Sequence, residues 1–108
     1  MAGGLVQYDE QANGRQVEAQ LGEEFEVVLP ETRTAGYRWR ILQKGDPPVD
    51  LLAESSRPSD AGVGGAGNHR WHFRAVAAGA AEIKLQYGRS WNDSAEPART
   101  FTLKVRVE

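Results

Sequence analysis

Apolar residues recur at every second position in several short runs of this chain, and this alternation limits what the chain can fold into. In the first clear run, Phe25, Val27 and Leu29 alternate with two glutamates and a valine. The apolar positions of the later runs are Tyr37, Trp39 and Ile41; Trp71 and Phe73; Ile83, Leu85 and Tyr87; and Phe101, Leu103, Val105 and Val107. Successive side chains of a β-strand point to opposite faces, so each run predicts a strand with one apolar face. No long stripe has the 3.6-residue period of a helix, and we expect an all-β protein.

The runs predict about seven to eight strands in a single domain over residues 1–108. The expected strands cover residues 24–29, 37–43, 49–54, 68–75, 81–88 and 99–107, after a less regular N-terminal strand region, 1–20, with pieces at 5–8 and 16–19. This number of half-buried strands in about 100 residues is typical of an immunoglobulin-like antiparallel β-sandwich. Trp39 on the expected third strand fits that fold, in which a tryptophan at this place often fills the centre of the core.

Composition excludes several classes of function. The chain has no cysteine, which excludes disulfides, thiolate metal sites and a cysteine nucleophile. Its 13 basic and 15 acidic side chains are interleaved without a basic stripe, so we expect no nucleic-acid partner. No apolar run approaches the ~20 residues of a membrane span, so we expect no membrane partner. The first five residues lack the features of a signal peptide, which fits either a cytoplasmic protein or one that has lost a leader.

Candidate catalytic groups are few. His69 and His72 are separated by an odd number of positions on one expected strand, so they point to opposite faces and cannot hold one metal together. His69 shares its face with Trp71 and is expected at the margin of the core, whereas His72 is expected to face solvent. No serine lies in a nucleophile elbow. We predict that the protein is not an enzyme.

Three connections between the expected strands are long: residues 30–36, 55–67 and 89–98. If neighbouring strands alternate in direction, every second connection lies at the same end of the sandwich, and these three are every second connection. We therefore expect them to gather at one end, as the binding loops of antibody variable domains do.

Each long connection carries unusual residues that also have a plain interpretation. The small and hydroxylated residues before Gly36 suggest a compact turn with a free edge, or an ordinary turn. The four glycines within residues 62–67 let a partner approach the backbone closely, or simply form a flexible loop. A phosphate cradle is discarded because a strand, not a helix, is expected to follow. Trp91 lies beyond the apolar face of its strand, where it either anchors an interface or folds back over the core.

Taken together, the three connections resemble the chagasin-like family, protein inhibitors of papain-family cysteine peptidases. The hallmarks of that family are an Asn-Pro-Thr-Thr-Gly-Tyr/Phe segment followed by Trp two positions on, a Gly-rich segment, and an Arg-Pro-Trp segment. The matching residues of this chain are Thr32, Arg33, Thr34, Ala35, Gly36 and Tyr37, with Trp39; Gly62, Val63, Gly64, Gly65, Ala66 and Gly67; and Arg89, Ser90 and Trp91. The resemblance covers the chain from about Leu21 to its C-terminus, and the order and spacing of the motifs match.

The resemblance implies a reversible, tight-binding inhibitor that occludes the active-site cleft of a papain-like cysteine peptidase with three loops. Residues 34–36 would lie over the catalytic cysteine, the Gly-rich segment along one side of the cleft, and Trp91 with Arg89 on the other side. Such blockade needs no cofactor and no metal. The expected partner is a papain-family cysteine peptidase, and we expect a monomer.

The chain departs from the family pattern in its first and last segments. Arg33 and Ser90 stand where the family has prolines, and Ala35 replaces the second threonine. Losing two prolines raises the entropy lost on binding, so we expect effects on potency and target range more than on mechanism. The alternative function is a generic immunoglobulin-like binding module for carbohydrate or adhesion, in which Trp91 would stack on a sugar ring. A sugar platform does not call for the motifs at residues 34–37 and 62–67.

Overall fold

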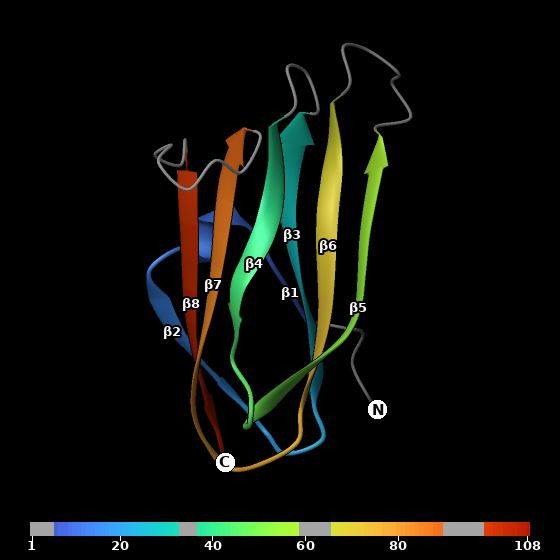
Figure 1. Cartoon of the computed structure of the whole chain (residues 1–108). Helices are drawn as coiled ribbons and strands as arrows, with labels where there is room; N and C mark the ends of the chain where they lie inside the picture. Colours follow the sequence, from blue (N-terminus) through green and yellow to red (C-terminus); the bar gives the residue numbers. More distant parts are fainter. Residues whose placement is uncertain (1–5, 33–36, 59–65, 90–98) are drawn as a thin grey trace.

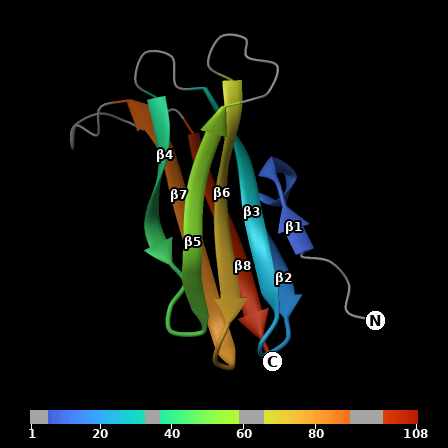
Figure 2. The same cartoon turned by 90° about the vertical axis from the view of Figure 1, so that its right-hand side faces the viewer.

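Two four-stranded sheets pack face to face in the computed structural model, which describes residues 6–32, 37–58, 66–89 and 99–108 (Figures 1 and 2). The elements are β1 (Val6–Tyr8), the short 3-10 helix η1 (Glu10–Ala12), β2 (Arg15–Ala19), β3 (Glu24–Thr32), β4 (Tyr37–Lys44), β5 (Val49–Pro58), β6 (Ala66–Ala75), β7 (Gly79–Arg89) and β8 (Arg99–Val107). No α-helix occurs in the described ranges. The prediction of an all-β, immunoglobulin-like sandwich is confirmed.

The strand order is β1-β3-β6-β5 in one sheet and β2-β8-β7-β4 in the other. The N-terminal strand region is divided between them, because η1 separates β1, which joins the first sheet, from β2, which joins the second. β1 pairs with β3, and β2 pairs with β8, in parallel, while all other pairs are antiparallel. We expected purely antiparallel sheets, but both sheets are mixed. The reason is that β1 and β2 each run in the same direction as the strand with which they pair.

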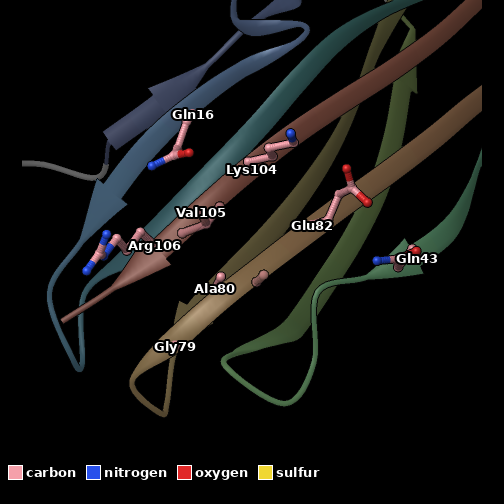
Figure 3. Close-up of a pocket in the computed structure, with 9 residues that line it drawn as sticks. Gln16, Gln43, Gly79, Ala80, Glu82, Lys104, Val105 and Arg106 are labelled. Atoms are coloured by element: carbon pink, nitrogen blue, oxygen red, sulfur yellow. The ribbon is translucent and has the colours of Figure 1, made fainter.

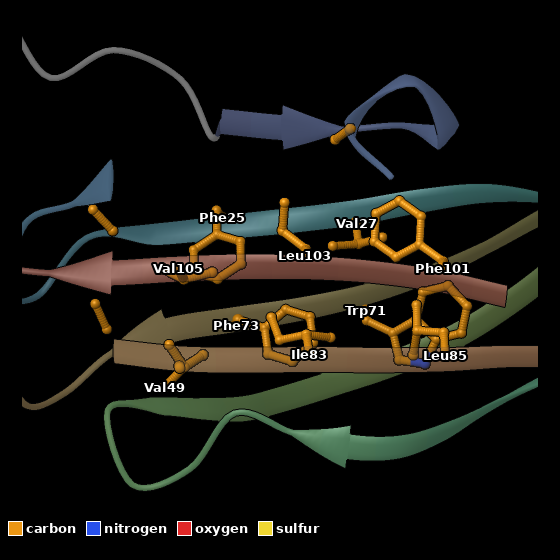
Figure 4. Packing of buried hydrophobic residues seen from close by; sticks show 14 of the residues in the cluster. Phe25, Val27, Val49, Trp71, Phe73, Ile83, Leu85, Phe101, Leu103 and Val105 are labelled. Atoms are coloured by element: carbon orange, nitrogen blue, oxygen red, sulfur yellow. The ribbon is translucent and has the colours of Figure 1, made fainter. Parts of the chain in front are cut away.

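The core lies between the sheets and consists of the residues that the alternation placed on the apolar faces (Figure 4). Phe25 on β3 and Phe73 on β6 are paired in register and stack, with ring centroids 5.3 Å apart. From the other sheet, Ile83, Leu85, Phe101, Leu103 and Val105 close the same interior. Burying apolar area stabilises the fold by roughly 25 cal/mol per Å², so these side chains supply most of the driving force for folding.

β4 and β5 are edge strands of their sheets, and each contains a bulge. The pairing shifts between Ile41 and Gln43 on β4, and between Leu51 and Ala53 on β5. A bulge adds an unpaired residue and strengthens the local twist, a common device at sheet edges that limits pairing with other chains. On β5 it also changes which residues face inward beyond it, and this brings Glu54 and Ser56 into register with Trp71 and His69 of β6.

Several strands extend further than the alternation predicted. β3 ends at Thr32 instead of residue 29, β5 ends at Pro58 instead of residue 54, and β6 begins at Ala66 instead of residue 68. The additional residues are polar or small, so they carry no apolar alternation. They are held by backbone pairing instead: Thr32 pairs with Ala66, and Pro58 pairs with Gly67.

Candidate binding site at one end of the sandwich

The strand ends that flank the three long connections lie together at one end of the sandwich (Figure 1). Strand pairing joins the end of β3 to the start of β6, the end of β5 to the start of β6, and the start of β4 to the end of β7, where Tyr37 pairs with Arg89. β8 begins beside β7 at the same end, where Arg99 pairs with Tyr87. The strand ends therefore have the arrangement that strand counting predicted.

The structure describes only part of the predicted site. Thr32, Tyr37, Ala66, Gly67 and Arg89 belong to strand ends, and their backbones are placed by the pairings above. The other predicted site residues lie outside the described residues: Arg33, Thr34, Ala35, Gly36, Gly62, Val63, Gly64, Gly65, Ser90 and Trp91. Their roles remain predictions, and they return under the proposed function.

A polar cluster lies directly beneath these strand ends, buried at Glu31, Trp39 and His69 and open to solvent at Glu54, and we call it the Glu31 cluster. Its members are Glu31 of β3, Trp39 of β4, Glu54 and Ser56 of β5, and His69 of β6. The Glu31 carboxylate is 3% exposed and accepts hydrogen bonds from three sides. The Trp39 backbone N–H donates to it at 2.9 Å, His69 Nδ1 lies 2.9 Å from the same oxygen, and Ser56 Oγ donates to the other oxygen.

His69 is held between two carboxylates. Its Nδ1 lies 2.9 Å from Glu31 Oε2, and its Nε2 lies 2.7 Å from Glu54 Oε2. Each ring nitrogen thus has a carboxylate oxygen within hydrogen-bonding distance, and both nitrogens can donate at once only when the ring is an imidazolium. The ring also stacks on Trp71, with centroids 4.1 Å apart and planes 5° apart, an arrangement that favours a cation over an aromatic face.

Two opposing influences set the pKa of Glu31. Burial, the larger single influence, raises it, but the hydrogen bonds from Ser56, His69 and the Trp39 backbone together outweigh burial. The pKa of Glu31 is therefore lowered from its usual value. Since hydrogen bonds to a carboxylate favour its charged form, Glu31 is a charged carboxylate inside the sandwich, and it forms an ion pair with His69 when the ring is protonated.

Trp39 connects the two sheets at this point. Its backbone N–H donates to Glu31, and its indole Nε1 donates to the carbonyl oxygen of Pro30 at 2.9 Å. Its ring lies against Trp71 and Tyr87, with centroids 6.3 and 5.1 Å away. β4 is thus fastened to β3 across the interior, although the two strands belong to different sheets.

The two histidines occupy the places that the sequence predicted. His69 is buried at the core margin, whereas His72 is on the outer face, where its Nε2 lies 2.6 Å from Glu24 Oε1. The apolar alternation ends at Leu29, so Glu31 was expected in a connection and not at a buried position. The signal was present, because Glu31 continues the inward parity of Phe25, Val27 and Leu29.

Two hollows lie on the described part of the molecule. The larger, of about 630 Å³, is on the outer face of the β2-β8-β7-β4 sheet near Gly79, far from the candidate site, with Gln16, Glu82 and Lys104 around it (Figure 3). The smaller, of about 280 Å³, lies beside Trp39 and Arg99. Within the described ranges, no group of three or more histidine, cysteine, aspartate or glutamate side chains is arranged to hold a metal ion. Nor does this part of the chain contain a helix long and apolar enough to cross a membrane.

Comparison with known proteins places the chain in a family of inhibitors. Residues 18–105 match the sequence model described as Chagasin family peptidase inhibitor I42. The chain is 33% identical over 91 residues to Amoebiasin-1 of Entamoeba histolytica, which covers 81% of this chain and 84% of that protein. It is 25% identical over 100 residues to Chagasin of Trypanosoma cruzi, which covers 88% of this chain and 91% of that protein.

A solved structure shows the same fold. The crystal structure of the cysteine protease inhibitor EhICP2 from Entamoeba histolytica superimposes with a TM-score of 0.82 at 18% identity, over 96% of this chain and 95% of that one. The match of the family model over most of the chain establishes the class, and the chain belongs to the chagasin family of peptidase inhibitors. This confirms the resemblance and the prediction that the protein is an inhibitor and not an enzyme.

Proposed function

We propose that this protein is a reversible, tight-binding inhibitor of papain-family cysteine peptidases, and that it occludes their active-site cleft with the segments 32–37, 62–67 and 89–91. The observation that carries the proposal is the strand pairing at one end of the sandwich. It brings together the strand ends within each sheet, and the Trp39 hydrogen bonds to Glu31 and Pro30 join the two sheets at the same end. A cleft can be blocked by three segments at once only if their bases are close together and rigidly held.

Family membership supports the class of partner. One relative by fold is described as a cysteine protease inhibitor, and the family model describes peptidase inhibitors. In the proposed complex Thr34, Ala35 and Gly36 cover the catalytic cysteine, and Gly36 permits close approach because it has no side chain. Residues 62–67 pair along one wall of the cleft through their backbone, and Trp91 packs with Arg89 on the other wall.

Purified protein is expected to inhibit papain reversibly and to leave a serine peptidase such as trypsin untouched. Occlusion of a cleft blocks access to the catalytic thiolate without acylation of the inhibitor. The measurement is residual papain activity against inhibitor concentration, with recovery of activity on dilution and electrophoresis of the mixture. An absence of inhibition at micromolar excess, or steady cleavage of the chain within residues 34–36, would overturn the proposal.

Replacing Gly64 and Gly65 together with valine is expected to weaken papain inhibition with little change in melting temperature. β-Branched residues resist positive φ and hold a partner's backbone away, whereas glycine does neither. Ala80→Val is the matched control, since Ala80 is exposed near the opposite end of β7 and should tolerate the same side chain. If the double variant inhibits as well as the unmodified protein, the glycines are only a flexible spacer.

A further inference from the structure

The Glu31 cluster places charge where the rest of the interior is apolar. Glu31 and His69 occupy inward-facing positions near the candidate site on β3 and β6, two strands whose inward residues further from that end include Phe25, Val27, Trp71 and Phe73. Taking two charges out of water is costly, and replacing a buried ion pair with apolar side chains of similar volume is often neutral or stabilising. Stability alone therefore does not account for an ion pair at this place.

What the ion pair achieves is a fixed geometry among four strands. Glu31 of β3 contacts His69 of β6 and Ser56 of β5, and it also accepts the Trp39 backbone N–H of β4, which belongs to the opposite sheet. Glu54 of β5 holds the far side of the His69 ring. Hydrogen bonds are directional, so this network sets the spacing of the sheets more narrowly than apolar packing does.

The network lies at the base of one predicted binding segment. Glu31 immediately precedes Thr32, the last residue of β3, and Trp39 lies two residues after Tyr37, the first residue of β4. The two Trp39 bonds, to Glu31 and to the Pro30 carbonyl, fasten these two strands together where the chain enters and leaves the segment 33–36. Arg33 stands where the family pattern has a proline, so this segment lacks the pre-organisation that a proline supplies.

We infer that Glu31 and His69 are positioning residues for peptidase binding: their buried ion pair fixes the ends of β3 and β4 and thereby raises the affinity of the segment between them for the peptidase cleft. The inference rests on the proposed function and adds the residues that pre-organise it. Pre-organisation increases affinity by reducing the ordering cost paid on association. Glu31 and His69 themselves are buried, so they act through the strand ends and do not touch the partner.

The chain contains a matched control for this pair. Glu24 and His72 also form a glutamate–histidine pair between β3 and β6, but on the outer face and toward the opposite end of the strands. Glu31→Gln and Glu24→Gln are therefore the same chemical change on the same strand, and His69→Gln and His72→Gln are the same change on its neighbour. The two pairs differ in burial and in distance from the candidate site, so the stability of each variant is measured beside its inhibition constant.

The test measures papain inhibition constants for these four variants at a temperature where thermal melts show each to be fully folded. We expect Glu31→Gln and His69→Gln to raise the inhibition constant about tenfold, and Glu24→Gln and His72→Gln to change it less than about twofold. A second readout separates positioning from a general effect on the fold.

In a background with Thr34→Gly and Ala35→Gly, the effect of Glu31→Gln on the inhibition constant should shrink, because a loosened segment no longer benefits from a fixed base. In a Trp91→Ala background the effect of Glu31→Gln should remain about tenfold.

Ser56→Ala keeps every charge and removes one hydrogen bond to Glu31, so it serves if either buried variant does not fold. An increase of about threefold in its inhibition constant supports the inference, and an unchanged constant contradicts it. Equal inhibition by Glu31→Gln and the unmodified protein, or a Glu31→Gln effect that is the same in all backgrounds, also overturns the inference while leaving the proposed function intact. A lack of papain inhibition by the unmodified protein is a different result, because it removes the proposed function and this inference with it.

Discussion

Replacing Trp91 with alanine is expected to weaken peptidase binding by at least about tenfold and to change the free energy of unfolding by under about 1 kcal/mol. An exposed indole offers a large apolar area and an N–H donor to a partner, and truncating a tryptophan at the centre of an interface typically costs at least ~2 kcal/mol. The lower bound of tenfold is below the typical loss because Ser90, which precedes Trp91, replaces the family proline. Without that proline, holding Trp91 in the interface costs more entropy and its net contribution to affinity is smaller. Surface substitutions seldom change stability by more than a few tenths of a kcal/mol.

Trp39→Ala is the control for Trp91→Ala because it removes the same side chain from the core. Trp39 is 5% exposed, packs on Trp71 and Tyr87, and donates its indole N–H to Pro30. Its loss should cost roughly 3–5 kcal/mol of stability. Urea unfolding and papain titration of both variants give the comparison. Unfolding of Trp91→Ala to the same extent as Trp39→Ala would assign Trp91 to the core and remove the main anchor of the proposed site.

Leu103→Ala and Leu42→Ala are expected to differ by several-fold in their cost to stability, although the chemical change is identical. Leu103 on β8 is 0% exposed at the centre of the core, and its truncation should cost about 2–5 kcal/mol through lost burial and the cavity left behind. Leu42 lies at the β4 bulge and is 49% exposed, so its truncation should cost under about 0.5 kcal/mol.

Urea unfolding midpoints and slopes of the two leucine variants make this comparison, since an unchanged slope shows that only stability has changed. A cost for Leu42→Ala close to that for Leu103→Ala would mean that the bulge does not turn Leu42 outward. In that case the description of β4 as an edge strand that exposes Leu42 at its bulge would be wrong.

Alternation predicted the strands well because each inward position of the central runs is apolar. Alternation did not predict the ends of β3 and β5, because the inward positions there are polar. Beyond Leu29 the inward position is Glu31, and beyond the β5 bulge the inward positions are Glu54 and Ser56, so polar residues concealed strands that continue. The Glu31 cluster unites residues from four strands, and the contribution of β5 depends on a bulge that shifts its parity. No local pattern in the sequence encodes that shift.

The motifs of the candidate site were more accessible to sequence reasoning than its foundation. Thr34, Gly36 and Trp91 stand out in the sequence because of their residue types and spacing, and strand counting sufficed to predict that the strand ends beside them share one end of the sandwich. The ion pair beneath them did not stand out, since a single glutamate and a single histidine in separate strands have no distinctive spacing. Its discovery required the register between β3 and β6.

The parallel pairing of β2 with β8 has a consequence for synthesis of the chain. Residues 15–19 are made before their partners, residues 103–107 of β8, which follow every other strand that the structure describes. β2 has no place in its sheet until then, and β7 too waits for β8 along one of its edges. The sheet of β1, β3, β6 and β5 contains no such late strand and can form while synthesis continues. Pairing between residues distant in the sequence is slow, and the apolar faces of the unpaired strands stay exposed to solvent until it is complete. The β2-β8-β7-β4 sheet is therefore more exposed to aggregation during synthesis than the β1-β3-β6-β5 sheet.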